Sequence, residues 1–147
     1  SEMCIRDRYY DGIKRYTKLS QLKRKLKRVK EIVANKKTQQ FANLVRSYRK
    51  SYIGKGPEQV KVFFKDNWAI CHMTGSLSKV ENFYLRNKDF QSMLKYGRTE
   101  EIKELYKQKP PVEMEELVGA NFVKLFTDVN LEDDEVVSIF VFDKSIE

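Results

Sequence analysis

The chain has 147 residues, of which 29 are Lys or Arg, 21 are Asp or Glu and 41% are apolar. This length and apolar content predict one packed domain and exclude wholesale disorder. The net charge of +8 is unevenly distributed, because residues 1–57 hold 17 basic and 4 acidic residues whereas residues 58–147 hold 12 and 17. The composition therefore excludes a globally basic protein and predicts a basic arm joined to an acidic domain.

The sequence contains no run of about 18 apolar residues, so it predicts no membrane-spanning helix. Its charged opening also lacks the apolar core of a signal peptide. Two cysteines, Cys4 and Cys71, cannot form a disulfide framework, which favours a reducing cytoplasm. Residues 1–8 resemble a translated sequencing-adapter remnant, and the fold predictions therefore leave them aside.

Residues 9–37 are expected to form a basic helical arm, in which apolar residues recur every three or four positions. The apolar stripe consists of Leu19, Leu22, Leu26, Val29 and Val33. The basic residues around it are Lys23, Arg24, Lys25, Lys27, Arg28 and Lys30. One interpretation is attachment to an anionic partner, either nucleic acid or a lipid surface. The other is a solvated helix whose stripe packs on the following domain or on a partner helix.

A second apolar stripe covers residues 41–52, and Gly54 stands where such a helix usually ends. Residues 35–38 offer a break between the stripes, so the spacing leaves one helix or two open. Residues 54–57, Gly-Lys-Gly-Pro, predict a turn. They lack the spacing and the Ser/Thr of a phosphate-binding loop, so we do not expect a nucleotide site there.

A β-hairpin is expected after this turn. Val60, Val62 and Phe64 alternate with other residues at period two, which predicts a strand. Residues 66–67 can make a tight turn, and residues 68–74 read as the second strand. Alternation thus predicts one face of the hairpin turned toward the core.

Cys71 and His72 are adjacent in this second strand, which invites a nucleophile–base interpretation. Neighbouring side chains of a strand point to opposite faces, so the two cannot form a hydrogen-bonded pair. We therefore predict that Cys71 is a small core residue and that His72 is a hydrogen-bonded residue of the sheet surface.

A helical region is expected between the hairpin and the end of the chain. Ser78 and Glu81 have the spacing of a capping box, which predicts a helix start. Gly97 is expected to stop this helical region, and Thr99 to cap the next helix. A short helical turn over residues 113–118 is the last helical element that the pattern predicts.

Residues 122–129 return to period two, and residues 136–142 are apolar on both faces, as in a central strand. The acidic loop between them, residues 132–135, fits no calcium-loop spacing and is expected to be a solvated hairpin tip. Asp128 is expected to cap a turn, with a place in a site as the alternative. The order of elements predicts an α+β domain over residues 38–147, with a four-stranded antiparallel sheet packed by helices.

Several short segments have the order and spacing of one known domain, and they are residues 54–62, 74–77, 97–98, 111–119, 127–128 and 141–143. Over about residues 41–145 the chain thereby resembles the MpsC-like domain family. The family positions, which we expect to be structural, are Gly54, Gly56, Pro57, Val60, Val62, Gly75, Glu81 and Asp128. The family is named for a component of a sodium-translocating, membrane-potential-generating system. The chain departs from the family pattern at Ser78, where Thr is usual, and at the two prolines of residues 110–111.

The resemblance implies a cytoplasmic accessory domain with no established activity of its own, linked to a membrane ion-translocating or bicarbonate-transport system. A protein partner such as a subunit of that membrane complex is therefore expected. Hydrophobic sheet surface and strand edges also make a homo-oligomer an expected state. The sequence has no paired carboxylates, zinc-type spacing or nucleotide fingerprint, so we predict a protein that is not an enzyme and needs no metal or cofactor.

Overall fold

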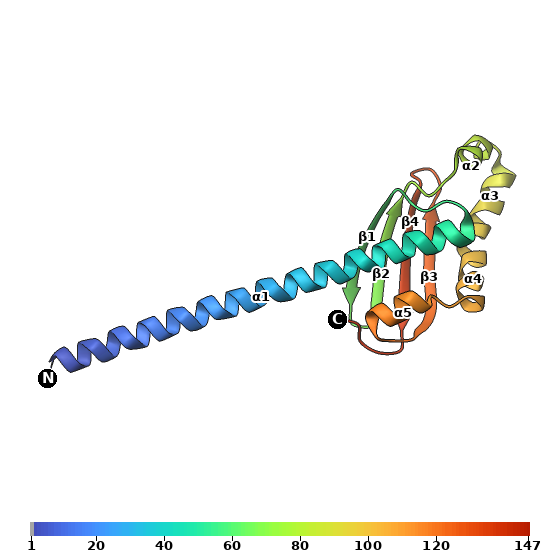
Figure 1. The fold of residues 1–147 in the computed structure, drawn as a ribbon. Helices are drawn as coiled ribbons and strands as arrows, with labels where there is room; N and C mark the ends of the chain where they lie inside the picture. The colour runs from blue at the N-terminus through green and yellow to red at the C-terminus, as the bar shows by residue number, and fades with distance from the viewer. Residues whose placement is uncertain (1) are drawn as a thin grey trace. The chain divides into compact units, whose positions relative to one another are not determined.

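The computed structural model describes residues 2–147, with side chains from residue 8 onward. Residues 1–8, which resemble an adapter remnant, lie outside the described side chains except for residue 8, so the structure does not test that interpretation. Helix α1 (Glu2–Ile53) is a single helix, coloured from blue to teal in Figure 1. The break offered by residues 35–38 is therefore absent, and both apolar stripes belong to one helix. The chain divides into two compact units, residues 1–36 and residues 37–147.

The unit of residues 37–147 begins with the last part of α1 and continues into a β-hairpin. Strands β1 (Gln59–Lys65) and β2 (Trp68–Thr74) pair antiparallel. The tight turn at residues 66–67 is confirmed, and Asp66 adopts a positive φ of 53° there. Alternate residues of β2 are buried, so the predicted orientation of the hairpin is confirmed.

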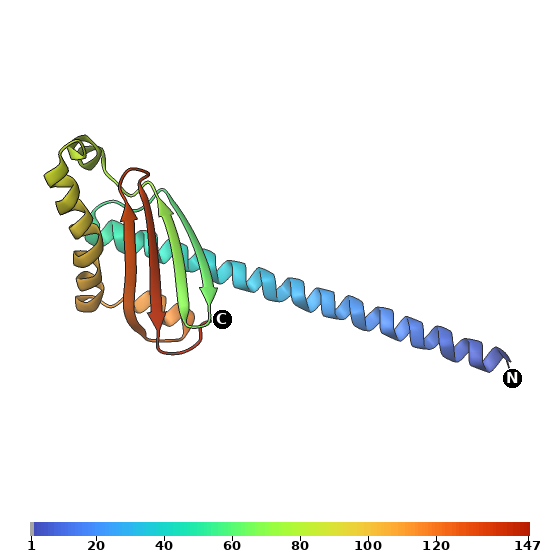
Figure 2. The ribbon, with the colours of Figure 1, turned by 180° about the vertical axis from the view of Figure 1, so that it is seen from behind.

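A second hairpin completes the sheet. Strands β3 (Phe122–Asn130) and β4 (Glu135–Phe142) pair antiparallel, and β4 also pairs with β2. The resulting order is β1-β2-β4-β3, seen from the side opposite to Figure 1 in Figure 2. The predicted α+β class with a four-stranded antiparallel sheet is confirmed. The central place of β4 follows from its apolar residues on both faces.

Short helices connect the two hairpins. They are α2 (Lys79–Tyr84), α3 (Lys88–Tyr96), α4 (Ile102–Gln108) and α5 (Val112–Val118), with a π-helical turn, Gly97–Glu101, between α3 and α4. The capping box at the start of α2 is confirmed. The predicted stop at Gly97 and cap at Thr99 are wrong. Gly97 is right-handed helical with φ of −61°, and the Thr99 hydroxyl donates back to the Lys95 carbonyl at 2.7 Å, so helical structure continues through both.

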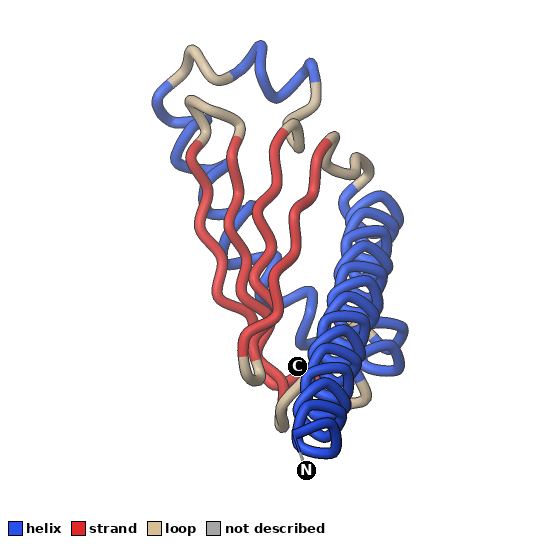
Figure 3. The backbone as a smooth tube through the Cα atoms, turned by 90° about the vertical axis from the view of Figure 1, so that its left-hand side faces the viewer, coloured by secondary structure: helices blue, strands red, loops and turns tan. Residues whose placement is uncertain are grey.

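The core lies on the face of the sheet that the end of α1 and helices α4 and α5 cover. Figure 3 shows the backbone of the sheet nearly edge-on, with α1 beside it. Phe41 of α1 is fully buried and makes edge-to-face contacts with Phe64, Phe140 and Phe142, at centroid distances of 5.6, 5.4 and 6.2 Å. Such pairs stabilise beyond their buried area. This aromatic cluster holds α1 on the sheet. The other face of the sheet is not covered by a helix of this unit.

Candidate functional site

Four of the family-motif residues, Gly54, Gly56, Pro57 and Gly75, lie at the end of the sheet where β1 begins and β2 ends. Gly54 ends α1 with φ of +100°, which favours glycine, and the Lys55 ammonium donates to the Leu77 carbonyl at 2.7 Å. Gly75 has φ of +70°, and a Cβ there would lie 2.7–2.8 Å from side-chain atoms of Glu58. Both glycines are thus required by backbone conformation, and the second also by close approach.

Gly56 and Pro57 fasten the same turn to α1. A Cβ on Gly56 would lie 3.0 Å from the backbone oxygen of Arg46, and the Arg46 Nε donates to the Pro57 carbonyl at 3.3 Å. Val60 and Val62, the other family positions here, face the core from β1. These four positions therefore contribute to the turn and to the core of the domain.

Asp134 joins this region from the opposite hairpin. Its Oδ1 accepts hydrogen bonds from the amides of Ser76 and Leu77 at 2.9 and 3.1 Å, and its carbonyl accepts one from Gly75 at 3.2 Å. The expectation of a solvated acidic tip is therefore wrong for this residue. It holds for Glu132 and Asp133, which are exposed.

A buried ion pair lies behind the motif residues. The Arg98 guanidinium donates from Nη2 to both carboxylate oxygens of Glu81, at 2.7 and 2.9 Å, and also to the Ser76 carbonyl at 3.2 Å. Burial favours the neutral carboxylic acid, but the hydrogen bonds and charge of Arg98 and the Ser78 amide outweigh it and hold the pKa of Glu81 below its ordinary value. Glu81 therefore has two functions, because it also closes the capping box of α2.

A second arginine is buried without a carboxylate partner. Arg49 of α1 is 1% exposed, and its Nε and Nη1 have no hydrogen-bond partner among the described residues. It lies within electrostatic reach of Tyr106, Arg98 and Cys71. Burial lowers the pKa of Arg49, and it raises the pKa of the Tyr106 hydroxyl, which also lacks a partner among the described residues.

Cys71 and His72 occupy the positions that the sequence predicts. Cys71 is fully buried, and burial raises the pKa of its thiol well above the ordinary value. His72 lies on the opposite face, where its Nε2 forms a hydrogen bond with Glu135 Oε2 at 3.0 Å. Both expectations, a core thiol and a hydrogen-bonded sheet-surface histidine, are confirmed.

An apolar row crosses the open face of the sheet. Register pairs Phe63 with Ile70, Ile70 with Ile139, and Ile139 with Phe126, so one residue from each strand lies in a line. The two phenylalanines at its ends are 59% and 48% exposed. We call these four residues the apolar row.

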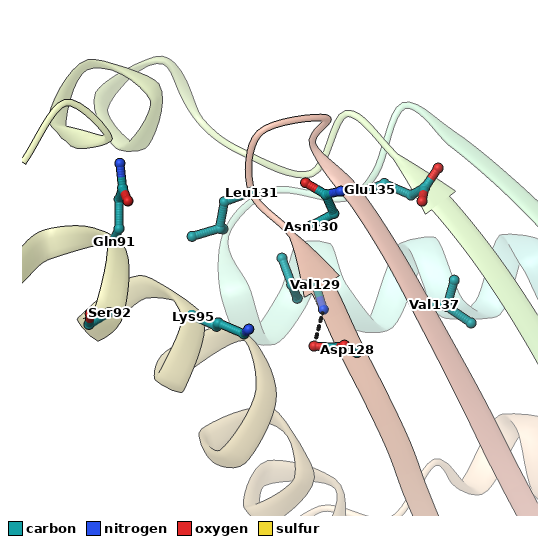
Figure 4. A pocket seen from close by; sticks show the side chains of 9 residues that line it. All are labelled: Gln91, Ser92, Lys95, Asp128, Val129, Asn130, Leu131, Glu135 and Val137. Atoms are coloured by element: carbon teal, nitrogen blue, oxygen red, sulfur yellow. Dashed lines mark hydrogen bonds between the residues drawn. The ribbon is translucent and has the colours of Figure 1, made fainter. Parts of the chain in front are cut away.

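Two rows with charged ends border the apolar row. One consists of Lys65, Trp68, Val141 and Lys124, and the other consists of Lys61, His72, Val137 and Asp128. Asp128 lies inside β3, so the expectation that it caps a turn is wrong. Its Oδ1 accepts a hydrogen bond from the Val129 amide at 2.9 Å, and with Lys95 of α3 it lines a surface hollow of about 670 Å³ (Figure 4).

The predicted anion-binding residues of the arm are all exposed on α1: Lys23, Arg24, Lys25, Lys27, Arg28 and Lys30. The apolar stripe among them is exposed as well, by 47–61% per residue. In the part of the chain that the structure describes, no helix combines the length and apolarity needed to cross a membrane.

The family of the chain follows from comparison with known proteins. The family model described as the Na+-translocating membrane potential-generating system (MpsC) matches residues 34–144. The chain belongs to the MpsC family. The uncharacterized protein YrhF of Bacillus subtilis (strain 168) is 40% identical over 113 residues, which cover 77% of this chain and 93% of that relative. No solved structure matches the chain.

The MpsC domain contains polar residues that sequence reasoning missed. Arg49 is the most informative, because it lies four residues after Val45, which lies four residues after Phe41. A basic residue in that buried series was the available signal. Asp134 carried no comparable signal, since its partners are more than 50 positions away.

Proposed function

We propose that residues 37–147 form a non-enzymatic protein-interaction module in the cytoplasm, accessory to a membrane-potential-generating system. The module would dock on its partner through the open face of the sheet. The observation that carries this proposal is the apolar row, which crosses all four strands. The description of the MpsC family names a membrane-potential-generating system, and this supports the search for the partner among the proteins of such a system.

An open sheet face usually carries polar side chains, because it meets water. Here Phe63 and Phe126 remain substantially exposed with two isoleucines between them. Full burial of one such side chain is worth about 1.5–3 kcal/mol, so a partner that covered the row would gain appreciable binding energy. Contiguous apolar surface of this kind marks contact sites.

The charges around the apolar row favour a different protein over a second copy. Three of the four residues that end the bordering rows are lysines. In a two-fold dimer of sheets, an axis along the strands would place Lys65 opposite Lys124, and an axis along the row would place Lys61 opposite Lys65. In either arrangement the contact between two lysines cancels the contact between the remaining lysine and Asp128, so these charges give a second copy no net attraction. A partner with an apolar centre and acidic rim fits this face better.

The residues best suited to nucleophilic chemistry support a non-enzymatic function. Cys71 is buried, and its raised thiol pKa disfavours the reactive thiolate. His72, the single histidine of the sequence, lies on the other face of the sheet and bonds Glu135. A general base is thus separated from the thiol by the sheet itself.

The test is co-expression of the full chain with the membrane subunits of its system, followed by affinity purification. We expect a membrane subunit to co-purify, and the double variant Phe63→Ser/Phe126→Ser to lose it while keeping the melting temperature. Phe83→Ser, an equally apolar and exposed change on α2, is the matched control and should retain the subunit. Failure of every membrane subunit to co-purify with the parent chain would reject the proposal. Light scattering that shows a dimer dissolved by the double variant would assign the face to self-association instead.

A second candidate function rests on the arm. Its exposed apolar stripe lies among six exposed basic residues, the composition of a helix that lies on an anionic lipid surface. Each basic side chain near such a surface contributes about 1 kcal/mol, and salt screens the attraction. Nucleic acid uses the charges equally well but has no comparable use for the aliphatic stripe. We therefore propose an anionic membrane surface as the ligand of the arm.

Vesicle flotation of the full chain separates these ligands. We expect binding to phosphatidylserine-containing vesicles and weak binding to phosphatidylcholine alone at about 0.15 M salt. Lys25→Gln/Lys27→Gln/Arg28→Gln and Leu22→Ser/Leu26→Ser should each weaken vesicle binding. No binding to the anionic vesicles would refute this function. Tighter binding to RNA, unaffected by the two leucine changes, would assign the arm to nucleic acid.

A further inference from the structure

Helices α2 and α3 stand at one end of the domain and take no part in its core (Figure 1). The structure describes every residue of these two helices and buries none of them. A short helix in a protein owes most of its stability to an apolar face that packs on the rest of the fold. An apolar face on these helices therefore needs a different explanation. We call residues 79–96 the α2–α3 lobe.

Such a face exists, as an apolar strip that continues from α2 to α3. Its members, which we call the lobe strip, are Val80, Phe83, Tyr84, Phe90, Met93 and Tyr96. Ring contacts join Phe83 to Tyr84 at 5.5 Å and Tyr84 to Phe90 at 5.2 Å between centroids. Met93 and Tyr96 follow Phe90 at steps of three residues, so they are neighbours on the surface of α3. Met93 and Phe83, at 70% and 68%, are the two most exposed large apolar side chains of residues 37–147.

Polar contacts hold the α2–α3 lobe on the domain in place of apolar packing. The Glu81 carboxylate caps α2 and pairs with the buried Arg98 guanidinium. The Asn87 side chain caps α3 and accepts hydrogen bonds from the amides of Asp89 and Phe90 at 2.9 and 3.3 Å. These bonds fix the lobe in place without covering the lobe strip.

The α2–α3 lobe is basic although the domain around it is acidic. Residues 79–96 hold four basic and two acidic residues, whereas the rest of residues 58–147 holds 8 basic and 15 acidic residues. One of the two acidic residues is Glu81, whose charge Arg98 balances. The basic residues are exposed and form no ion pair with the described part of the chain: Lys79, Arg86, Lys88 and Lys95. The lobe therefore suits an anionic partner.

The acidic turn between β3 and β4 lies on the other side of α3 from the lobe strip. Gln91 and Lys95 line the hollow that this turn borders (Figure 4). Met93 lies two residues from each of them, which turns it to the opposite side of the helix. An anionic partner on the strip therefore does not meet the acidic turn. The cations left to such a partner are Lys79, Arg86 and Lys88.

We propose that the α2–α3 lobe is a membrane-contact site that lies on an anionic lipid surface. Its strip enters the headgroup region, where the apolar side chains are buried and the hydroxyls of Tyr84 and Tyr96 stay hydrated. Lys79, Arg86 and Lys88 attract the anionic headgroups beside the strip. A second copy fits less well, because it would bring a second basic lobe against the first. This contact is independent of the open face of the sheet and of the arm.

The single tryptophan, Trp68, allows a local test of this contact. In the full chain with Trp68→Phe/Phe83→Trp, the fluorophore lies in the lobe strip. We expect vesicles of phosphatidylserine and brominated phosphatidylcholine to quench its fluorescence, and brominated phosphatidylcholine alone to quench it little, at about 0.15 M salt. Trp68→Phe/Val112→Trp is the matched control, because Val112 is 57% exposed on α5 at the other end of the domain (Figure 1). Its fluorescence should not be quenched.

Vesicle flotation tests the lobe strip in a chain whose arm is weakened by Lys25→Gln/Lys27→Gln/Arg28→Gln. In this background Phe83→Ser/Met93→Ser should lower binding to phosphatidylserine-containing vesicles about ten-fold, because two apolar side chains lose their burial in lipid. The melting temperature should stay the same, since both side chains are exposed. Val112→Ser/Val123→Ser, an exposed apolar pair outside the lobe, is the control and should bind as the background does.

Several outcomes would overturn the proposal. Flotation of the full chain without quenching of the Phe83→Trp probe would assign membrane binding to the arm, and no flotation at all would also count against the site. Equal quenching by uncharged vesicles would reject the anionic surface. An oligomer that Phe83→Ser/Met93→Ser dissolves in light scattering would assign the strip to a second copy. Loss of a co-purified protein in that variant, with vesicle binding unchanged, would assign it to a protein partner.

Discussion

The Glu81–Arg98 pair gives the sharpest stability prediction, with Glu81→Gln as the perturbation. Glutamine keeps the length and the carbonyl acceptor but removes the charge that faces the Arg98 guanidinium at 2.7 Å. Breaking a buried pair from one side costs about 3–5 kcal/mol, because the other ion stays buried and unpaired. The Glu81 side chain is 20% exposed, so water relieves part of this cost. We expect a loss of about 2–3 kcal/mol in the free energy of unfolding.

Urea unfolding at neutral pH measures this loss, with Glu100→Gln as the control. Glu100 pairs with Lys103 at 3.1 Å on the surface, and its change should cost less than about 0.5 kcal/mol. Because the folded-state pKa of Glu81 is lowered from 4.5, its stabilisation is present above that pH and is lost as the pH falls through the folded-state value. The difference between parent chain and Glu81→Gln should therefore shrink in acid. Equal costs for the two variants, or a difference independent of pH, would refute the reasoning.

Three further predictions concern the core and its turns. Phe41→Ala should cost about 3–5 kcal/mol in urea unfolding, since it empties the centre of the aromatic cluster; a cost below about 1 kcal/mol would contradict that packing. Gly75→Ala should destabilise more than Gly119→Ala, because both have positive φ but only the first Cβ would clash, at 2.7 Å; equal costs would argue against the clash. In a Cys4→Ser background, Cys71 should react with a thiol reagent only as fast as the protein unfolds; rapid reaction of the native protein would show an accessible thiol.

The strands were predictable because alternation reports burial directly. One face of β2 is buried and the other is not, so apolar residues at every second position are sufficient to place Cys71 in the core and His72 outside. Likewise β4, apolar on both faces, had to lie between two neighbours. The capping box of α2 was readable because both of its hydrogen bonds join Ser78 and Glu81, three residues apart.

The helical breaks were harder to predict, because their outcome depends on surroundings. Residues 35–38 have the composition of a helix end, yet α1 continues through them, since weak local signals do not stop a long helix. Gly97 resembled a stop, but nothing required a left-handed conformation there and the helix continued as a π-helical turn. The strand was expected to end at residue 129 but β3 ends at Asn130, so Asp128 lies within the strand and does not cap a turn.

The sequence by itself determined the class of fold and which residues of each strand face the core. It also separated a basic arm from an acidic domain. Only the tertiary structure decided that Glu81 pairs with Arg98, that Asp134 holds the turn after β2, and that Arg49 is buried with no carboxylate partner among the described side chains. The physical reason is the separation along the chain of the residues that interact. Periodicity and capping act within about four residues, whereas the pairing of a buried charge depends on which distant segments the hydrophobic core brings together.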